Sequence, residues 1–306
     1  MLDRHPCRLS TRPRTRSRTS RLSGLMLTGL AALTALAAGT LLLSATPASA
    51  GDLAEVKTRG KLVMLTFPVQ GGFFDVVNVD VMREQGLAFK DLHKPEQFSG
   101  IDVDVVNGFA KSLGVELEID VTGDGFGNLI PALVHKEADL VASELTITPA
   151  RQEMVDFSSP YATNWIAVIA KKGTPIAGPR DFPGKKAAII RGSSHEEFLK
   201  SVAPDVPVEG TGFDLESLEA LASGRVDFTL IDSTVPPGEA VDVLHPDLVV
   251  AFRLKDINDG VAVRKGSDLL APLNAYLARI RKSGELQKIL DRHGFGKAAP
   301  KPVRTP

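Results

Sequence analysis

The stretch "GNLIPALVHKEADLVASELTITPARQEMVDFSSPY" (residues 127–161) contains the pattern that decides the fold. It opens with apolar residues at helical spacing, which are Leu129, Ile130, Leu133 and Val134. The next apolar run, "ADLVA" (138–142), has the length of a buried strand, and "WIAVIA" (165–170) resumes a strand pattern further on. A polar connection with Glu144, Arg151 and several hydroxyl groups lies between them. Helix, strand and polar connection in this order are typical of an α/β protein.

The same alternation extends along the chain in both directions. Strand patterns occur in "GKLVMLTF" (60–67), "VELEIDV" (115–121), "KKAAII" (185–190) and "VDFTLI" (226–231). Helical spacing occurs in 106–113, 194–202, 214–223 and 268–294, the last broken at Ser283 and Gly284. The run 101–105 alternates as a strand would before the helical spacing begins. Repeated β-α-β units predict mostly parallel sheets flanked by helices.

Residues 1–50 have the order of an export signal. Seven Arg and one Asp lie within residues 1–23, and a charge-free apolar stretch ending in "TPASA" follows. This order predicts a signal peptide that is cleaved near Ala50, with a retained membrane anchor as the alternative. The basic region has no Arg-Arg pair, which favours the general secretion route to the periplasm. The Pro- and Lys-rich tail (297–306) is predicted to be disordered.

The remaining composition excludes several classes of function. Without residues 1–50 the formal net charge would be −7, and an acidic exported protein is a poor candidate for binding nucleic acid. The single Cys is Cys7, so the rest of the chain has neither a disulfide nor thiolate chemistry. The His residues lack metal-binding spacing, and the sequence contains no Walker-type loop or Gly-x-Ser-x-Gly motif. We therefore expect no metal and no cofactor.

Polar connections follow four of the expected strands, at 123–128, 143–151, 191–196 and 232–233. Ligands of open parallel sheets bind beyond the carboxyl ends of the strands, so these connections should meet at one site. Arg151 offers a planar fork that pairs bidentately with a carboxylate, and Asp232 accepts from an ammonium group. Hydroxyl groups and the amides of helix starts complete a shell that suits a small zwitterion.

These residues carry a resemblance to the amino-acid-binding proteins of ABC importers, the family 3 solute-binding proteins. The run 100–119 is similar to that family's opening motif, and 260–296 resembles its closing helices. The most specific part is Thr-x-Thr-x-x-Arg (146–151) followed by "DFSSPY" (156–161). The resemblance implies a two-lobe, type II periplasmic binding protein. Lobe 1 would comprise 51–166 and 259–296, lobe 2 would comprise 167–258, and the two chain crossings would form a hinge.

The family's ligand-binding residues map onto this sequence position by position. Arg151 matches the Arg that clamps the ligand α-carboxylate, and Ser194 matches a hydroxyl of the second lobe that also meets it. Asp232 matches the Asp that binds the α-ammonium group. Thr146 matches a neighbouring contact position, and Phe126 matches an apolar wall. Ser143, which opens the same connection as Thr146, is a further candidate.

Two features depart from the family pattern. Glu144 stands where the family usually has Gly or Ser, and it would face either a cationic ligand or an internal partner such as Arg191. The segment Gln70–Phe98 is longer than the family's usual connection. That connection normally supplies an aromatic side chain to the pocket, for which Phe67, Phe73 and Phe74 are the candidates.

Several of these residues also have a purely structural interpretation. Arg151 could pair at the surface with Glu153 or Asp156, and Asp232 could be a simple cap. Phe126 could belong to the edge of the core. Ser193 and Ser194 with the two following Glu residues form a capping-box pattern, which is compatible with ligand contact.

The resemblance implies a monomeric binding protein, not an enzyme. It would capture a polar amino acid or a related small zwitterion and deliver it to an ABC permease in the membrane. The alternative is an enzyme on the same fold. Cyclohexadienyl dehydratases place a catalytic Glu three residues beyond the position of Asp232, where this sequence has Val235, although Glu239 is nearby. Lytic transglycosylases fuse a similar module to a lysozyme-like domain, for which we expect no room after residue 300.

Overall fold

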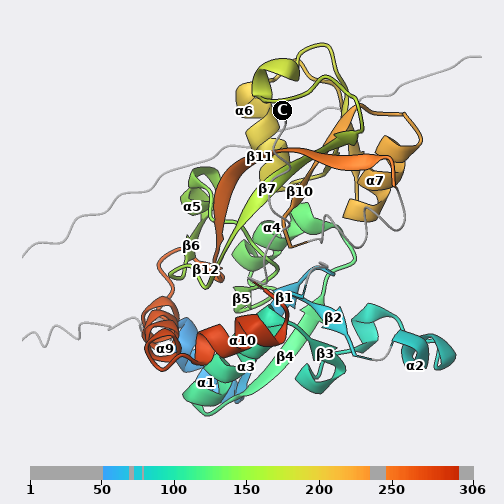
Figure 1. The fold of residues 1–306 in the computed structure, drawn as a ribbon. Coiled ribbons are helices and arrows are strands. Elements are labelled where there is room, and N and C mark those ends of the chain that lie inside the picture. The colour runs from blue at the N-terminus through green and yellow to red at the C-terminus, as the bar shows by residue number, and fades with distance from the viewer. Residues whose placement is uncertain (1–50, 69–71, 78, 235–245, 296–306) are drawn as a thin grey trace, which may run out of the picture. The chain divides into compact units, whose positions relative to one another are not determined.

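The computed structural model describes residues 51–68, 72–77, 79–234 and 246–295. The expected signal peptide and tail lie outside these residues, as do Val235 and Glu239. The described chain forms two five-stranded sheets and one two-stranded ribbon (Figure 1). Within these ranges, no helix combines the length and the apolar character that crossing a bilayer requires.

The first sheet is built from strands within residues 61–157 and from one strand near residue 263. In spatial order these are β4 (Glu116–Val121), β1 (Lys61–Thr66), β5 (Leu140–Val141), β12 (Ala262–Arg264) and β6 (Val155–Phe157). β1 is parallel to both β4 and β5, whereas β12 is antiparallel to both β5 and β6. The helices around this sheet are α1 (Asp52–Arg59), α3 (Ile101–Leu113), α4 (Leu129–Val134), α5 (Pro149–Met154), α9 (Leu270–Lys282) and α10 (Glu285–Arg292).

The second sheet is built from the middle of the chain. In spatial order its strands are β11 (Leu248–Asp259), β7 (Ala162–Lys171), β10 (Phe228–Asp232), β8 (Ala187–Ile190) and β9 (Val208–Thr211). β8 is parallel to β9 and β10, and β7 is antiparallel to β10 and β11. The helices of this part are α6 (Ser194–Val202), α7 (Asp214–Ala222) and the short 3₁₀ turn η4 (Pro179–Asp181).

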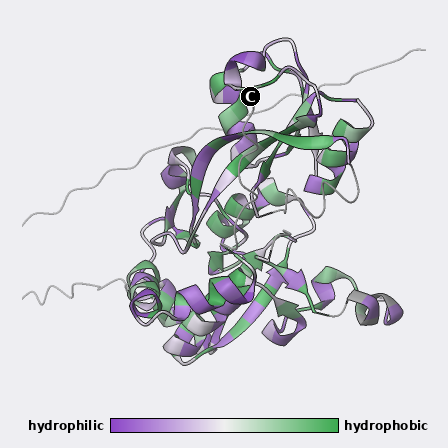
Figure 2. Ribbon diagram, in the orientation of Figure 1, coloured by the Kyte–Doolittle hydropathy of each residue, from purple (hydrophilic) through white to green (hydrophobic). Residues whose placement is uncertain are grey.

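Each sheet is buried on both faces, which explains its apolar strands. In β1, Leu62 and Met64 face a core shared with α3, α9 and α10, whereas Leu65 faces a second core with α4. In the second sheet, Ile189 packs with α6 and Ala188 with α7. Figure 2 shows green, apolar colour along both sheets. Burying one such large side chain contributes about 1.5–3 kcal/mol.

The expected strand at 101–105 is wrong, because α3 begins at Ile101. Gly100 before it has φ 135, which favours glycine, and its Cα packs against the backbone of Phe73. Both faces of the first turn of α3 are buried, and even Asp102 is buried. The apolar residues at 101, 103 and 105 are therefore explained by burial of the helix and not by an extended chain. The other expected strands and helices form close to their predicted positions.

The Gln70–Phe98 insertion is anchored to the first sheet's core. Its described elements are β2 (Asp75–Val76), α2 (Val79–Glu84) and the 3₁₀ turns η1 (Phe89–Asp91) and η2 (Pro95–Gln97), and β2 pairs with β3 (Phe98–Ser99). Phe73 and Phe74 are buried in that core. Of the three aromatic candidates, therefore, only Phe67 remains near a polar connection.

The chain passes twice between the sheets, and the two passages lie side by side. β6 leads into β7 through 158–161, and β11 leads into β12 through Gly260 and Val261. β7 and β11 pair so that Ala162 lies opposite Asp259. The Tyr161 amide donates to the carbonyl of Asp259 at 3.0 Å, which joins the passages directly.

Candidate ligand-binding site

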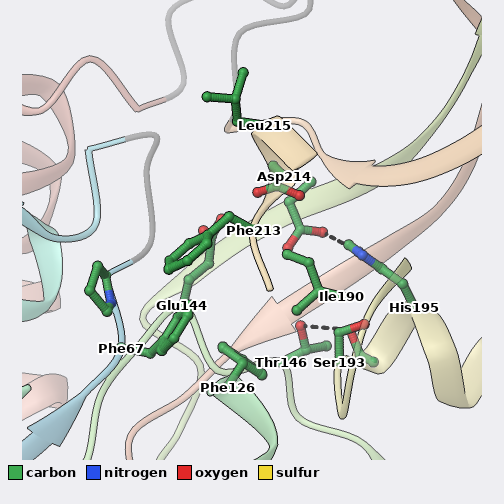
Figure 3. Close-up of a pocket in the computed structure, with 13 residues that line it drawn as sticks. Phe67, Phe126, Glu144, Thr146, Ile190, Ser193, His195, Phe213, Asp214 and Leu215 are labelled. Carbon is green, nitrogen blue, oxygen red and sulfur yellow. Dashed lines mark hydrogen bonds and ion pairs between the residues drawn. The ribbon is translucent and has the colours of Figure 1, made fainter. Parts of the chain in front are cut away.

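A cavity lies at the carboxyl ends of β1, β4, β5, β8 and β10, where the sequence predicted a site (Figure 3). Six of the predicted site residues line it: Phe67, Phe126, Glu144, Thr146, Ser194 and Asp232. Phe67 follows β1, Phe126 begins the 3₁₀ turn η3 (Phe126–Asn128), and Ser194 begins α6. The ends of five strands, β1, β4, β5, β8 and β10, thus bring these residues together. Arg151 and Ser143, the other two candidates, do not line the cavity.

Ser143 is held within the first sheet's body. It is fully buried, and its hydroxyl group both accepts from the amide of Phe67 at 3.0 Å and donates to the carbonyl of Phe67 at 3.2 Å. These bonds tie the end of β5 to the end of β1. Ser143 therefore positions Phe67, whose side chain reaches the cavity.

Arg151 is buried beside the cavity, with only 4% of its side chain exposed. Its guanidinium donates to the carbonyls of Thr146 at 2.9 Å and Gly192 at 3.2 Å, and its Nε lies 3.5 Å from Glu197 Oε1. It also lies over the ring of Phe126, 5.5 Å from the centroid. The alternative of surface pairing with Glu153 or Asp156 is wrong, since Arg151 is not at the surface.

The backbone places Arg151 through a capped helix. Thr148 is the N-cap of α5, its hydroxyl accepts from the amide of Arg151 at 3.2 Å, and Pro149 occupies the first helical position. Burial lowers the pKa of Arg151, while the nearby Glu197 opposes that shift. The guanidinium group remains a cation with hydrogens to spare for a further acceptor.

Ser193 and Ser194 start α6 and meet the other side of the cavity. The Ser193 hydroxyl accepts from the amide of Glu196 at 3.3 Å, and the Glu196 carboxylate accepts from the amide of Gly192 at 2.7 Å. The Ser194 hydroxyl donates to Oγ1 of Thr146 at 3.3 Å. The helix start is therefore capped, as predicted, and it also contacts the connection after β5.

Glu144 has hydrogen-bonding partners within the protein. Among the described residues, Arg191 is not one of them. Its carboxylate accepts from Asn164 Nδ2 at 3.1 Å and from the Thr234 hydroxyl at 2.5 Å. The suggestion of Arg191 is wrong, because that guanidinium packs against Gly210 instead. Burial raises the pKa of Glu144 well above its usual range, and the charges of Asp232 and Asp259 add to the shift.

The backbone of Glu144 is in the left-handed region, with φ 46. Its amide donates to Asp102 Oδ2 at 2.9 Å, and Asp102 Oδ1 accepts from the hydroxyl of Tyr161. Burial raises the pKa of Asp102 to about 7, although both of these hydrogen bonds lower it. Asp102 thus holds the backbone of Glu144 at a positive φ, which is unusual for a residue other than glycine. This strain indicates that the position of the Glu144 carboxyl group is strictly set.

Asp232 ends β10 and is paired with a residue that the sequence reasoning missed. His195 Nε2 lies 2.9 Å from Asp232 Oδ1, and both residues line the cavity. His195 belongs to the connection 191–196 that was already predicted to reach the site, so its position was a usable signal. Asp214, another lining residue, was also missed, and burial raises its pKa to about 6.

The apolar wall is a group of phenylalanine rings from three connections. Phe67 stacks on Phe213 with 5.1 Å between centroids and 20° between planes, and it meets Phe126 edge-on at 6.0 Å. Phe213 was missed because it follows β9, a strand that the sequence pattern did not reveal. Phe126 contacts both the core and the cavity, so its two interpretations are compatible.

The charges that line the cavity are unbalanced. Its described lining includes three carboxyl groups, from Glu144, Asp214 and Asp232, and one imidazole, from His195, but neither Lys nor Arg. Arg151, whose guanidinium lies beside the cavity, already contacts two carbonyls and Glu197. An acidic, aromatic cavity with a buried cation beside it is suited to a ligand that carries more positive than negative charge.

Comparison with known proteins identifies relatives of this chain. The arginine-binding extracellular protein ArtP of Bacillus subtilis (strain 168) is 31% identical over 199 residues, which cover 62% of this chain and 75% of that protein. The membrane-bound lytic murein transglycosylase F of Idiomarina loihiensis is 37% identical over 218 residues, which cover 67% of this chain. The chain spans about half, 46%, of the length of that transglycosylase.

A solved structure and a family complete the comparison. The amino acid ABC transporter substrate-binding protein AbpA from Streptococcus pneumoniae, bound to L-arginine, matches with a TM-score of 0.64 and 27% identity, over 78% of this chain and 96% of that one. The predicted type II periplasmic-binding-protein fold is confirmed. The family model of the bacterial extracellular solute-binding proteins, family 3, matches residues 83–297. The chain therefore belongs to the bacterial extracellular solute-binding proteins, family 3.

Proposed function

We propose that this protein captures a cationic amino acid and delivers it to an ABC permease in the membrane. The observation that carries the proposal is the acidic lining of the cavity, where Glu144, Asp214 and Asp232 face one imidazole. An α-amino acid with a neutral side chain would leave carboxyl groups without a partner in a partly desolvated site. A second positive group on the ligand would supply that partner.

The predicted residues receive specific roles in this proposal. Asp232 accepts from the α-ammonium group, and Arg151 clamps the α-carboxylate with the remaining hydrogens of its guanidinium. Ser194, at the start of α6, and Thr146 complete the carboxylate shell with hydroxyl and amide groups. Phe67, Phe126 and Phe213 form the wall along the ligand's side chain, and Glu144 lies within reach of a cationic end.

Capture by this design requires the two sheet-containing bodies to close on the ligand. We keep the two expected lobes, 51–166 with 259–296 and 167–258, but propose the hinge at the two paired passages, so that residues 162–166, which begin β7 of the second sheet, move with lobe 2. Two hydrogen bonds that join the proposed lobes would belong to such a closed state: Thr234 donates to Glu144, and Ser194 donates to Thr146. A ligand that touches both bodies would favour this state.

Export is part of the proposed function. Cleavage of the signal peptide near Ala50 would release the protein into the periplasm, where it would act as a monomer. Several relatives act as binding proteins, and the name of the arginine-binding ArtP supports an amino-acid ligand. The permease is expected from the family and not from any feature of the described residues.

An enzymatic role has weaker support. The transglycosylase is matched over less than half of its length, so its catalytic activity does not transfer to this chain. For a dehydratase, the catalytic Glu position corresponds to Val235, with Glu239 nearby, and both lie outside the described residues. Incubation with prephenate or arogenate separates these classes, because a binding protein leaves either compound unchanged.

A thermal-shift screen tests the proposed ligand class. L-Arginine and L-lysine should raise the melting temperature, because ligand at 1,000 times Kd stabilises the folded state by about 4 kcal/mol. L-Glutamine tests a neutral side chain of similar length, and L-glutamate tests an acidic one. If L-glutamate or L-glutamine gives the largest shift and the basic amino acids give none, the cationic ligand class is rejected.

A further inference from the structure

His195 and Asp232 form a pair within the second sheet's body. His195 lies in the first turn of α6, and Asp232 is the last residue of β10. The strand that precedes α6, β8, pairs with β10, so the two residues are brought close together. Their side chains are 6% and 16% exposed, and the Nε2–Oδ1 distance is 2.9 Å (Figure 3). Because both belong to the same body, the pair does not depend on how far the protein is closed.

The geometry leaves the second imidazole nitrogen free. His195 Nδ1 is buried and has no hydrogen-bond partner among the described residues. Nε2–H donates to Asp232, so Nδ1 is the atom that gains or loses the second proton. The Nε2 hydrogen bond is retained in both states, and only the charge beside Asp232 changes.

The groups that face His195 come from several elements. Asp232 belongs to β10, Asp214 to α7 and Arg151 to α5, while Glu196 and Glu197 follow it on α6. Burial opposes the imidazolium form, but the charges of Asp232 and Asp214 outweigh it and raise the pKa of His195, with Arg151 acting against them. His195 therefore keeps its second proton to a higher pH than an ordinary imidazole does.

We propose that His195 is a positioning residue that sets the strength of Asp232 as an ammonium acceptor, so that proton uptake by His195 weakens ligand capture. The inference rests on the proposed role of Asp232 in binding the ligand's α-ammonium group. One carboxylate oxygen is held by His195, and the other is left for the ligand. An imidazolium neutralises the carboxylate and repels the ammonium group, whereas a neutral imidazole only orients it.

Capture should therefore release a proton. Ligand binding and proton binding at His195 oppose each other, and the two effects are equal by linkage. In isothermal titration calorimetry with L-arginine, the wild-type Kd should be about tenfold weaker at pH 5.5 than at pH 8, which corresponds to a drop of about one unit in the pKa of His195 on binding. Buffers with different ionisation enthalpies measure the proton release directly.

The substitution His195→Gln separates this effect from structural loss. The Gln amide reaches about as far as Nε2 and keeps the N–H donor, but it does not titrate. Whatever its affinity at pH 8, His195→Gln should show a much smaller ratio of Kd values between pH 5.5 and pH 8 than the tenfold ratio expected of the wild type. Asp214→Asn tests the other nearby titrating group, whose pKa is about 6; because Asp214 also raises the pKa of His195, this variant should shift the pH dependence to lower pH without abolishing it. Wild-type pH dependence in His195→Gln, with loss of it in Asp214→Asn, would overturn the proposal.

A second measurement needs no ligand. The imidazole of His195 is titrated by NMR in the wild type and in Asp232→Asn. Its pKa should fall when the carboxylate is replaced, and an unchanged value overturns the pair's role. Failure of L-arginine to bind at any pH rejects the cationic amino-acid proposal instead, and this titration still decides whether Asp232 controls the charge of His195.

Discussion

Arg151 combines a structural role in the fold with a proposed role in the site. Its guanidinium holds two backbone carbonyls and Glu197 while it lies next to the cavity. The sequence motif predicted this residue as the clamp of a ligand carboxylate, and the structure places it buried beside the cavity. It could not reveal that protein groups already contact the guanidinium, because Gly192 and Glu197 come from a distant connection.

The first prediction is that Arg151 is essential for ligand binding. Truncating one partner of a desolvated charge pair costs about 2–5 kcal/mol, so Arg151→Ala should weaken L-arginine binding by at least tenfold. Arg151→Lys keeps the charge without the planar fork and should also lose affinity while remaining folded. Arg191→Ala is the matched control, because Arg191 is exposed and packs against Gly210. Unchanged calorimetric affinity in folded Arg151→Lys and Arg151→Ala would reject the clamp.

The second prediction concerns Glu144. Its buried carboxyl group faces Asp232 and Asp259, and a cationic ligand group would relieve their mutual repulsion. Glu144→Gln should therefore weaken binding of L-arginine by about tenfold and leave binding of L-glutamine nearly unchanged. Equal losses for both ligands would instead assign Glu144 to closure through its bond from Thr234.

The pH dependence of stability provides a ligand-free control for Glu144. Its folded-state pKa is raised, so its contribution to stability is complete at low pH and is lost as pH rises through that pKa. Glu144→Gln removes this loss. The variant should gain stability relative to the wild type at pH 8 and gain less at pH 5, as measured by denaturant unfolding.

Among the elements, periodicity predicted six of the ten strands described in the two large sheets, β1, β4, β5, β7, β8 and β10, and it did not predict β6, β11 or β12. It failed at the start of α3, where burial all around the helix imitates alternation. It also missed β9, whose residues 208–211 are mostly polar or small and only partly buried. Phe213 and Asp214 follow that strand, so the missed strand explains why these two site residues were missed, whereas His195 lies in a connection that was predicted. In both cases, the start of α3 and β9, tertiary packing determined the structure, and sequence periodicity carries no information on such packing.

The third prediction concerns the start of α3. A Cβ at Gly100 would lie 2.1 Å from the carbonyl oxygen of Phe73, and its φ of 135 is outside the ordinary range of L-residues. Gly100→Ala should destabilise the protein by about 2–4 kcal/mol, more than backbone strain alone would cause. Gly114→Ala, at the end of the same helix, has φ 77 but open space around it, and it should cost only about 1 kcal/mol. Equal losses in urea unfolding would contradict the role of the Phe73 contact.

At the scale of the whole molecule, the two passages between the sheets determine how a ligand can act. β7 and β11 form a long antiparallel pair, with two shifts of register, that ends at Ala162 and Asp259, beside the cavity-lining connections. The family resemblance predicted the two passages, but the polar network around them depends on residues far apart in sequence. Asn164 on β7, for example, donates to both Glu144 and Asp259.

The last prediction is that ligand binding closes the protein about these passages. The residues proposed to bind the ligand belong to both bodies, with Arg151 and Thr146 on one side and Ser194 and Asp232 on the other. A ligand that bridges them stabilises the closed state by its differential affinity for that state. Small-angle X-ray scattering should therefore show a smaller radius of gyration with saturating L-arginine. Arg151→Ala at the same L-arginine concentration is the control and should show no change. If the wild type binds L-arginine calorimetrically and its radius of gyration stays constant, closure is not coupled to capture, and the contacts from Thr234 and Ser194 hold the two bodies together with or without ligand.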